Sequence, residues 1–140
     1  MVDRQATAGP DRPRLILPLP PPDNHAYVAS VRYRGPRPIV RRVRTQRNRD
    51  FQAEAGWLAA AWRLRVGWRM PEPGVAVRLR YWTFWPDRRR RDGSNLLKPL
   101  LDALEGVLYL DDAFVLPQAV AYAVDRQNPR LELELEIEPP

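Results

Sequence analysis

The segment at residues 131–138 constrains the fold of this chain more than any other feature. It reads LELELEIE, so that an apolar residue and a glutamate alternate without interruption. A period of two places the apolar side chains on one face of a β-strand and the glutamates on the other, whereas a helix would distribute both around its circumference. The segment therefore predicts a half-buried strand, and so a chain that contains a sheet.

Other segments predict further strands and two helices. Strands are expected at 14–19, 27–34, 75–85, 107–110 and 119–124. One helix starts at Thr45 and is stopped by Pro71, with Trp57 and Trp62 as core or interface residues. A second starts with Ser94 as N-cap and ends at Gly106, with Pro99 disturbing its first turn. This order predicts an α+β fold, a small mixed or antiparallel sheet packed with two main helices.

Composition excludes several classes of protein. The chain has 140 residues, which fits one domain at 14–140 after a disordered tail at 1–13. It has no cysteine and one histidine, His25, so disulfides, zinc ribbons, thiol nucleophiles and multi-histidine metal sites are excluded. No apolar run approaches the ~20 residues that span a bilayer, and no signal peptide is recognisable at the start. These features predict a cytoplasmic protein without a membrane partner.

Charge is distributed unevenly along the chain. Residues 1–91 hold 20 arginines and seven acids, whereas residues 92–140 hold ten acids and three basic residues. The arginine-rich stretch 32–49 contains no acid and is expected to form a basic arm, a loop or the start of a helix. A basic first part indicates a polyanionic partner. Alternatively the two parts pair within the fold, for example through Arg78 and Arg80 opposite the glutamates of 131–138.

One lysine stands out among the basic residues. Of the 23 lysines and arginines, Lys98 alone is lysine. It lies in the segment RRRRDGSNLLKPLLDALEGVLYLDDAFV at 88–115, between Asp92 and the pair Asp111 and Asp112. A helix followed by a short strand can bring these carboxylates together, and carboxylates beside a basic patch suit Mg²⁺ and a phosphodiester. The competing interpretation is that the aspartates only cap helices and turns and that the arginines are solvated.

The same segment resembles the RusA family of Holliday junction resolvases. The family pattern is Asp-x-Asp-Asn-Leu-x-Lys, then Asp-Ala-Leu, a glycine and a strand that ends Asp-Asp. This chain matches it, in order, with Asp92, Asn95, Leu96, Lys98, Asp102-Ala103-Leu104, Gly106 and Asp111-Asp112. The stretch LPLPPPDNHAY at 17–27 is similar to a second family motif, and Asn128-Pro129-Arg130 also fits. The resemblance covers residues 14–138.

This resemblance implies a homodimeric, Mg²⁺-dependent endonuclease (Mn²⁺ as a possible substitute) that introduces paired nicks into four-way DNA junctions and associates with the nucleoid. Asp92 and Asp112 match the metal-binding acids, with Asp111 as an additional ligand, and Lys98 matches the catalytic-site lysine. Asn95 and Ser94 would support the site. Backbone phosphates would be bound by a further set of residues: Asn24, Arg41, Arg42, Arg44, Arg88, Arg89, Arg90 and Arg91. Asp102 is expected to make a helix-surface contact or salt bridge.

One departure from the family pattern leaves alternatives open. Ser94 stands where the family has its second aspartate, so the helix start is preserved but a negative charge is lost. The chain is therefore an active resolvase, or a junction- or duplex-DNA-binding protein with a weakened or inactive metal site. A third possibility is a structural or RNA-binding module in which the arginines at 32–49 act and the aspartates only cap helices.

Overall fold

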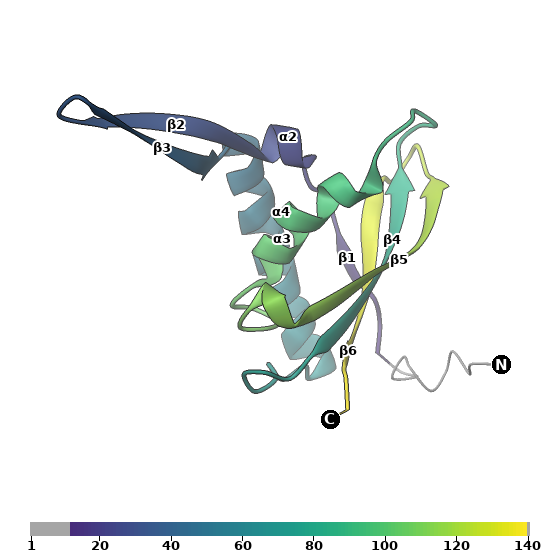
Figure 1. The fold of residues 1–140 in the computed structure, drawn as a ribbon. Helices are drawn as coiled ribbons and strands as arrows, with labels where there is room; N and C mark the ends of the chain where they lie inside the picture. Colours follow the sequence, from purple (N-terminus) through teal and green to yellow (C-terminus); the bar gives the residue numbers. More distant parts are fainter. Residues whose placement is uncertain (1–11, 140) are drawn as a thin grey trace.

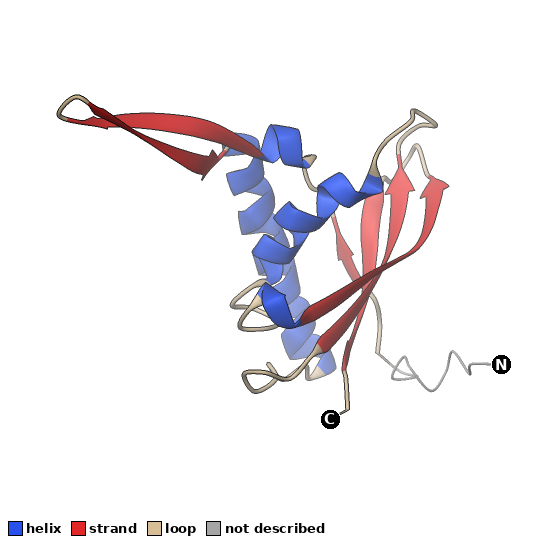
Figure 2. Cartoon of the chain, viewed as in Figure 1, coloured by secondary structure: helices blue, strands red, loops and turns tan. Residues whose placement is uncertain are grey.

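The computed structural model describes residues 12–139, so most of the tail expected at 1–13 lies outside the described residues. Figures 1 and 2 show a sheet covered on one face by helices, with a separate hairpin that projects from the body. The sheet has the order β1-β6-β4-β5, and the hairpin consists of β2 and β3. The α+β class and the small mixed sheet packed with two main helices are confirmed.

The sheet is built around β4 (Val77–Trp85), which pairs antiparallel with β6 (Arg130–Ile137) and parallel with β5 (Val115–Val124). On the other side, β6 pairs antiparallel with the short strand β1 (Leu15–Leu17). Alternate residues of β4 and β6 are buried, as the period of two predicts. On the opposite face Arg78 lies across from Glu136 and Arg80 across from Glu134, which confirms the expected arginine–glutamate pairing.

The long helix α3 (Gln46–Val66) begins where the sequence predicts. Thr45 is its N-cap, and the Thr45 hydroxyl accepts a hydrogen bond from the backbone N–H of Asn48. The helix ends at Gly67 in the left-handed region (φ 70°), which is four residues earlier than the prolines suggest. Trp62 is buried in the core, but Trp57 is 72% exposed, so of the two expected roles, core or interface, the core is wrong for Trp57.

The second helix has an irregular start, as Pro99 predicts. A 3₁₀ turn, η1 (Gly93–Leu96), precedes α4 (Leu97–Leu104). The N-cap of this segment is Asp92 and not Ser94, because the Asp92 carboxylate accepts a hydrogen bond from the Ser94 backbone N–H. The expected strand at 107–110 is also wrong. There the chain turns at Gly106 and makes one isolated bridge between Glu105 and Tyr109 before η2 (Asp112–Phe114).

The arginine-rich stretch 32–49 covers the outer part of a β-hairpin, its second strand and the start of α3. The strand expected at 27–34 is β2 (Tyr27–Arg34), and it pairs with β3 (Arg37–Arg44) through a turn at Gly35 (φ 62°). The short helix α2 (Asp23–Ala26) lies at the hairpin base (Figure 1). Most of the basic stretch is therefore an arm in the form of a β-ribbon, and its last residues, 46–49, are the start of α3, as one of the alternatives expected.

The core lies between the sheet and the helices. Its largest buried side chains come from β1, β4, β6, α3, α4 and the turn after α4, and they include Leu15, Leu79, Trp62, Leu100, Leu133 and Tyr109. Within the described residues, no helix has the length and hydrophobicity required to cross a bilayer.

Candidate active site

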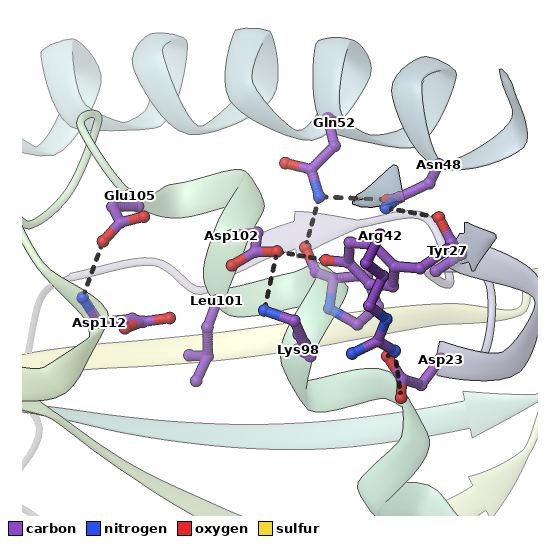
Figure 3. A network of polar contacts seen from close by, with 12 residues as sticks. Asp23, Tyr27, Arg42, Asn48, Gln52, Lys98, Leu101, Asp102, Glu105 and Asp112 are labelled. Carbon is purple, nitrogen blue, oxygen red and sulfur yellow. Dashed lines mark hydrogen bonds and ion pairs between the residues drawn. The ribbon is translucent and has the colours of Figure 1, made fainter. Parts of the chain in front are cut away.

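Three carboxylates meet where α4 ends and the chain returns towards the sheet. Asp102 lies in the last turn of α4, Glu105 follows the helix, and Asp112 begins η2. One oxygen of each lies within 4.8 Å of the other two. Gly106, at φ 80°, reverses the chain, and the Glu105 carboxylate accepts a hydrogen bond from the Asp112 backbone N–H at 3.2 Å. The turn at Gly106 thus brings Asp112, which matches the family pattern, next to Asp102 and Glu105 at the end of α4 (Figure 3).

Asp102 is held by two side chains on its other flank. The Tyr27 hydroxyl, at the hairpin base, donates a hydrogen bond to Asp102, and the Lys98 ammonium lies 3.6 Å from the same carboxylate oxygen. Lys98 also lies over the Tyr27 ring, 5.3 Å from its centroid. Burial, followed by the hydrogen bond to Asp102, raises the pKa of Tyr27 to about 12, so the hydroxyl remains a donor. The salt bridge expected of Asp102 is present.

Tyr109 is a buried neighbour of the three carboxylates. It is 1% exposed, and its hydroxyl donates to the backbone carbonyl of Leu101 at 2.6 Å. Burial raises the pKa of Tyr109, and the nearby charges of Asp112, Glu105 and Asp102 raise it further. An uncharged tyrosine therefore packs under the cluster without adding a negative charge to it.

Asp92 and Asp111 lie outside this cluster. Asp92 caps η1, at the opposite end of the η1–α4 segment from Glu105, and Asp111 caps η2 by accepting from the Ala113 backbone N–H at 2.9 Å. Within the described residues, the three-carboxylate group is Asp102, Glu105 and Asp112. The expected group of Asp92, Asp111 and Asp112 is therefore not formed in one chain. The physical reason is that twelve helical residues separate the two ends, a length of roughly 20 Å.

Ser94 is directly bonded to Asp92. The Ser94 hydroxyl donates to the Asp92 carboxylate at 2.7 Å, and the Ser94 backbone N–H donates to the same oxygen at 3.0 Å. These hydrogen bonds hold the pKa of Asp92 below its usual range. Asp92 is thus ionised and exposed, and one of its carboxylate oxygens is hydrogen-bonded to Ser94.

A cleft of about 500 Å³ opens beside Asp92. It brings together the proline-rich segment after β1, the start of α3 and the loop after β4. Its polar lining comprises Asn24, His25, Arg47, Arg89, Arg90, Arg91, Asp92 and Asn95, and its apolar walls include Pro20 and Trp85. Four guanidinium groups and two amides around one acid can bind the phosphates of a nucleic-acid strand. Asn24, Asn95 and the arginine loop, all singled out in the sequence, therefore share one surface.

Gly93 lets this loop approach the edge strand closely. A Cβ at Gly93 would overlap the hydroxyl of Tyr122 on β5 and lie 2.7 Å from its Cζ atom. Close packing against Tyr122 thus explains why the residue next to Asp92 is a glycine. No sequence pattern indicated the contact, because it joins residues that are distant along the chain.

The predicted DNA-binding arginines lie in two places, the loop after β4 and the hairpin. Arg88, Arg89 and Arg90 are exposed, whereas Arg91 is paired with Asp87 at 2.7 Å and lies over Trp85 at 4.8 Å. The hydrogen bonds from Arg91 and Arg89 lower the pKa of Asp87 to about 2. Arg41, Arg42 and Arg44 belong to the hairpin, and Arg42 is paired with Asp23 at 2.9 Å. Arg91 and Arg42 therefore also stabilise their own loops.

The donor set of the cluster fits a hard divalent cation. Carboxylate oxygens are the ligands that Mg²⁺ and Mn²⁺ take, and three of them converge on an accessible surface. Sequence reasoning missed Glu105 and assigned Asp102 only a salt bridge. Their spacing of three residues, which places two side chains on one side of a helix end, was the available signal.

Comparisons with known proteins give one consistent result. The family model for endodeoxyribonuclease RusA matches residues 18–136. The crossover junction endodeoxyribonuclease RusA of Escherichia coli strain K12 is 34% identical over 125 residues, covering 86% of this chain and 91% of that protein. The crossover junction endodeoxyribonuclease of Enterobacteria phage 82 is 33% identical over 122 residues, with the same coverage of both proteins.

Proposed function

The chain belongs to the RusA family of endodeoxyribonucleases, and from this premise we propose that it resolves four-way DNA junctions by paired, symmetric nicks with the help of Mg²⁺. The observation that carries the proposal is the convergence of Asp112 with Asp102 and Glu105 beside the single lysine. A homodimer in the cytoplasm, associated with the nucleoid, is part of the proposal, because a four-way junction offers two equivalent strands to a two-fold assembly.

The carboxylate cluster would hold the cation. Asp112, Asp102 and Glu105 supply three oxygens, and Tyr27 keeps Asp102 oriented by donating to it. A Mg²⁺ ion bound there would supply an activated water and stabilise the leaving oxygen of the phosphodiester. Lys98, whose ammonium is near the cluster and half exposed, would contact the scissile phosphate as a compact positive charge.

Asp92 would act at the DNA side of the site. It is exposed on the cleft together with Arg89, Arg90 and Asn95. The arginines would bind backbone phosphates and place the strand along η1 and α4, while the lowered pKa keeps Asp92 ionised. We propose Asp92 as a catalytic residue at this end of the site. Because twelve helical residues separate it from Glu105 of the cluster, the Mg²⁺ titration below tests whether Asp92 also binds a cation.

Ser94 favours a second candidate function. Its hydroxyl occupies an oxygen of Asp92 at the position where the resemblance expects a second carboxylate. A site with one charge fewer binds a hard cation less well. The alternative is therefore a protein that binds junctions or duplex DNA through its arginines and cuts weakly or not at all.

The deciding experiment compares a synthetic mobile four-way junction with linear duplex, in Mg²⁺ and in EDTA. Wild type should nick the junction in pairs only with Mg²⁺, and Asp112→Asn should lose at least ~10²-fold in rate, because the cluster loses a charged ligand. Asp50→Asn, the same substitution on an exposed carboxylate of α3, is the matched control and should retain the wild-type rate.

Three outcomes separate the candidates. Mg²⁺-dependent junction cleavage that vanishes in Asp112→Asn supports the resolvase. Tight, salt-sensitive junction binding without cleavage supports the binding protein. Equal treatment of junction and linear DNA contradicts both. Mg²⁺ titrations of Glu105→Gln and Asp92→Asn then identify the ligands, since a variant that lacks a ligand requires more Mg²⁺ for half-maximal rate.

A further inference from the structure

The hairpin formed by β2 and β3 has no sheet partner in the described chain. Its strands pair only with each other, and nearly all of their residues are exposed. Figures 1 and 2 show that it extends away from the helices and the sheet. An isolated two-stranded ribbon is marginally stable in water, because it has no layer against which to bury its apolar side chains. This geometry indicates that another surface covers the hairpin.

The register separates the two faces of the hairpin sharply towards its tip. Val31 pairs with Val40 and Tyr33 with Pro38, so these four residues lie on one face. Val31 is 50% exposed, Val40 65% and Tyr33 73%. The opposite face carries Arg32 across from Ile39, Arg34 across from Arg37, and Ser30 across from Arg41. Towards the tip one face is therefore apolar and uncharged, and this part is called the apolar face below. Nearer the base the same face carries Arg42 and Arg44, and the opposite face is strongly basic.

The two faces suit different partners. The arginine face suits DNA phosphates, in keeping with the proposed function. The apolar face offers no charge to a polyanion, but it can meet a second copy of the chain, whose net charge of +6 would repel contact at a charged surface. The chain presents one extended strand that also lacks charge, β5, which reads VLPQAVAYAV.

Strand β5 offers an uncharged surface that matches the apolar face of the hairpin. It forms one edge of the sheet, and nine of its ten residues are exposed. Its exposed apolar side chains include Leu116, Val120, Tyr122 and Val124. Uncovered, uncharged edge strands promote association, and proteins ordinarily protect them with charges. A surface of this kind in a chain with 29% charged residues is unusual unless it is covered.

We propose that the apolar face of the β2–β3 hairpin docks on strand β5 of a second copy of this chain. In a two-fold dimer the contact occurs twice, because each copy offers one hairpin and one β5. The arginines of the opposite face, Arg32, Arg34, Arg37 and Arg41, then remain open to DNA in both copies. The inference rests on the homodimer of the proposed function and names the surfaces that form it.

The first test uses two neighbouring residues of β2 that lie on opposite faces. Val31→Asp places a charge on the apolar face, and Ser30→Asp makes the same charge change on the arginine face. Sedimentation velocity over a range of concentrations should show a dimer for wild type and for Ser30→Asp. Val31→Asp should dissociate at least tenfold more readily, and circular dichroism should show that all three proteins are folded.

The second test exploits the absence of cysteine from the chain. Val40→Cys and Val120→Cys, carried on differently tagged chains, should form a mixed disulfide under mild oxidation. Arg41→Cys, next to Val40 but on the opposite face, should form much less of it with Val120→Cys. Because these are single engineered cysteines, each crosslink reports one pair of positions.

Four outcomes would overturn the inference: a monomeric wild type, a dimer unaffected by Val31→Asp, equal dissociation of both aspartate variants, or equal crosslinking from Val40 and Arg41 positions. Failure here is distinguishable from failure of the proposed function. A dimer of the stated kind that does not cut junctions contradicts the nuclease, whereas an enzyme that cuts junctions but ignores Val31→Asp contradicts this interface.

Discussion

Lys98 illustrates how one side chain acquires a role from its surroundings. Arginine occupies 22 of the 23 basic positions, but Lys98 lies on the first turn of α4, near Asp102 and over the ring of Tyr27. An ammonium group is a compact charge that can approach a crowded carboxylate cluster, whereas a planar guanidinium requires more room. The surrounding geometry thus accounts for a lysine here. It does not explain the general excess of arginine.

A substitution at Ser94 should increase the affinity of the site for Mg²⁺. Ser94→Asp replaces the hydroxyl that bonds Asp92 with a second carboxylate, so a cation bound beside Asp92 would gain a charged ligand. The Mg²⁺ concentration for half-maximal junction cleavage should fall several-fold. Ser94→Ala, which removes the hydroxyl without adding charge, is the control and should leave it unchanged or raise it. Identical Mg²⁺ curves for wild type and Ser94→Asp would exclude Ser94 from the cation's surroundings.

Tyr27 gives the fold a dependence on alkaline pH. Its pKa is raised from 10.0 to about 12 in the folded protein, so the folded state holds the phenolic proton more tightly than the unfolded chain does. The resulting stability is fully present below pH 10 and is lost as pH rises towards about 12. Urea unfolding at pH 9 and pH 11 should therefore show a smaller decrease in the free energy of unfolding for Tyr27→Phe than for wild type.

The same substitution has a cost at neutral pH. Tyr27→Phe removes the hydrogen bond to the Asp102 carboxylate, and for a partly buried pair we expect a loss of about 1 kcal/mol. If wild type and Tyr27→Phe lose equal stability between pH 9 and pH 11, the hydroxyl does not carry this pH dependence.

At the scale of elements, the η1–α4 segment and the β4–β6 pair each have two structural roles. The η1–α4 segment carries Asp92 at one end and Asp102 at the other, so a single helical unit connects the arginine-lined cleft with the carboxylate cluster. Strands β4 and β6 bury one face in the core and pair arginines with glutamates on the other. Part of the chain's basic charge is thereby neutralised within the fold and is not available to DNA.

Charge reversal within this pairing should destabilise the sheet. Arg80→Glu places a carboxylate directly across from Glu134, and like charges opposite each other in an antiparallel pair cost up to about 1 kcal/mol. Urea denaturation measures the change. Adding Glu134→Arg restores opposite charges across this pair but removes the ion pair of Glu134 with Arg14 at 3.2 Å, so only part of the loss should be recovered. An unchanged free energy of unfolding for Arg80→Glu would show that the pairing contributes nothing.

At the scale of the whole molecule, basic and acidic side chains lie on different surfaces. The hairpin and the loop after β4 carry arginines, while the carboxylates gather at the end of α4 and on β6. The glutamates of β6 lie across from arginines of β4, and the carboxylate cluster lies at the other end of the η1–α4 segment from the basic cleft. A DNA strand that runs from these arginines along η1 and α4 would reach the acids proposed to hold the cation.

This distribution predicts a strong and local salt dependence of DNA binding. Each phosphate contact contributes about 0.9 to the slope of log K against log salt, so Arg89→Gln with Arg90→Gln should reduce the slope by about 2. Fluorescence anisotropy with a labelled junction at several salt concentrations provides the measurement. Arg65→Gln, an exposed arginine at the end of α3, is the control. A slope unaltered by the double substitution would move the DNA away from the cleft.

The elements that the sequence predicted well depend on neighbours along the chain. The alternation of 131–138 determined a half-buried strand, Thr45 determined the start of α3, and Pro99 determined an irregular turn before α4, because periodicity, capping and ring geometry act over a few residues. The motif around Lys98 likewise pointed to the family that the comparisons identify.

Tertiary structure decided which of the predicted site residues meet. The sequence indicated Asp92 and Asp112 as ligands, with Asp111 as an additional one. The length of η1 and α4 separates Asp92 from Asp112, and the turn at Gly106 brings Glu105 to Asp112 instead. The approach of Tyr27 to Asp102, of Tyr122 to Gly93, and the projection of the hairpin also join distant segments. Such contacts depend on how complete layers pack, and local sequence patterns do not encode that packing.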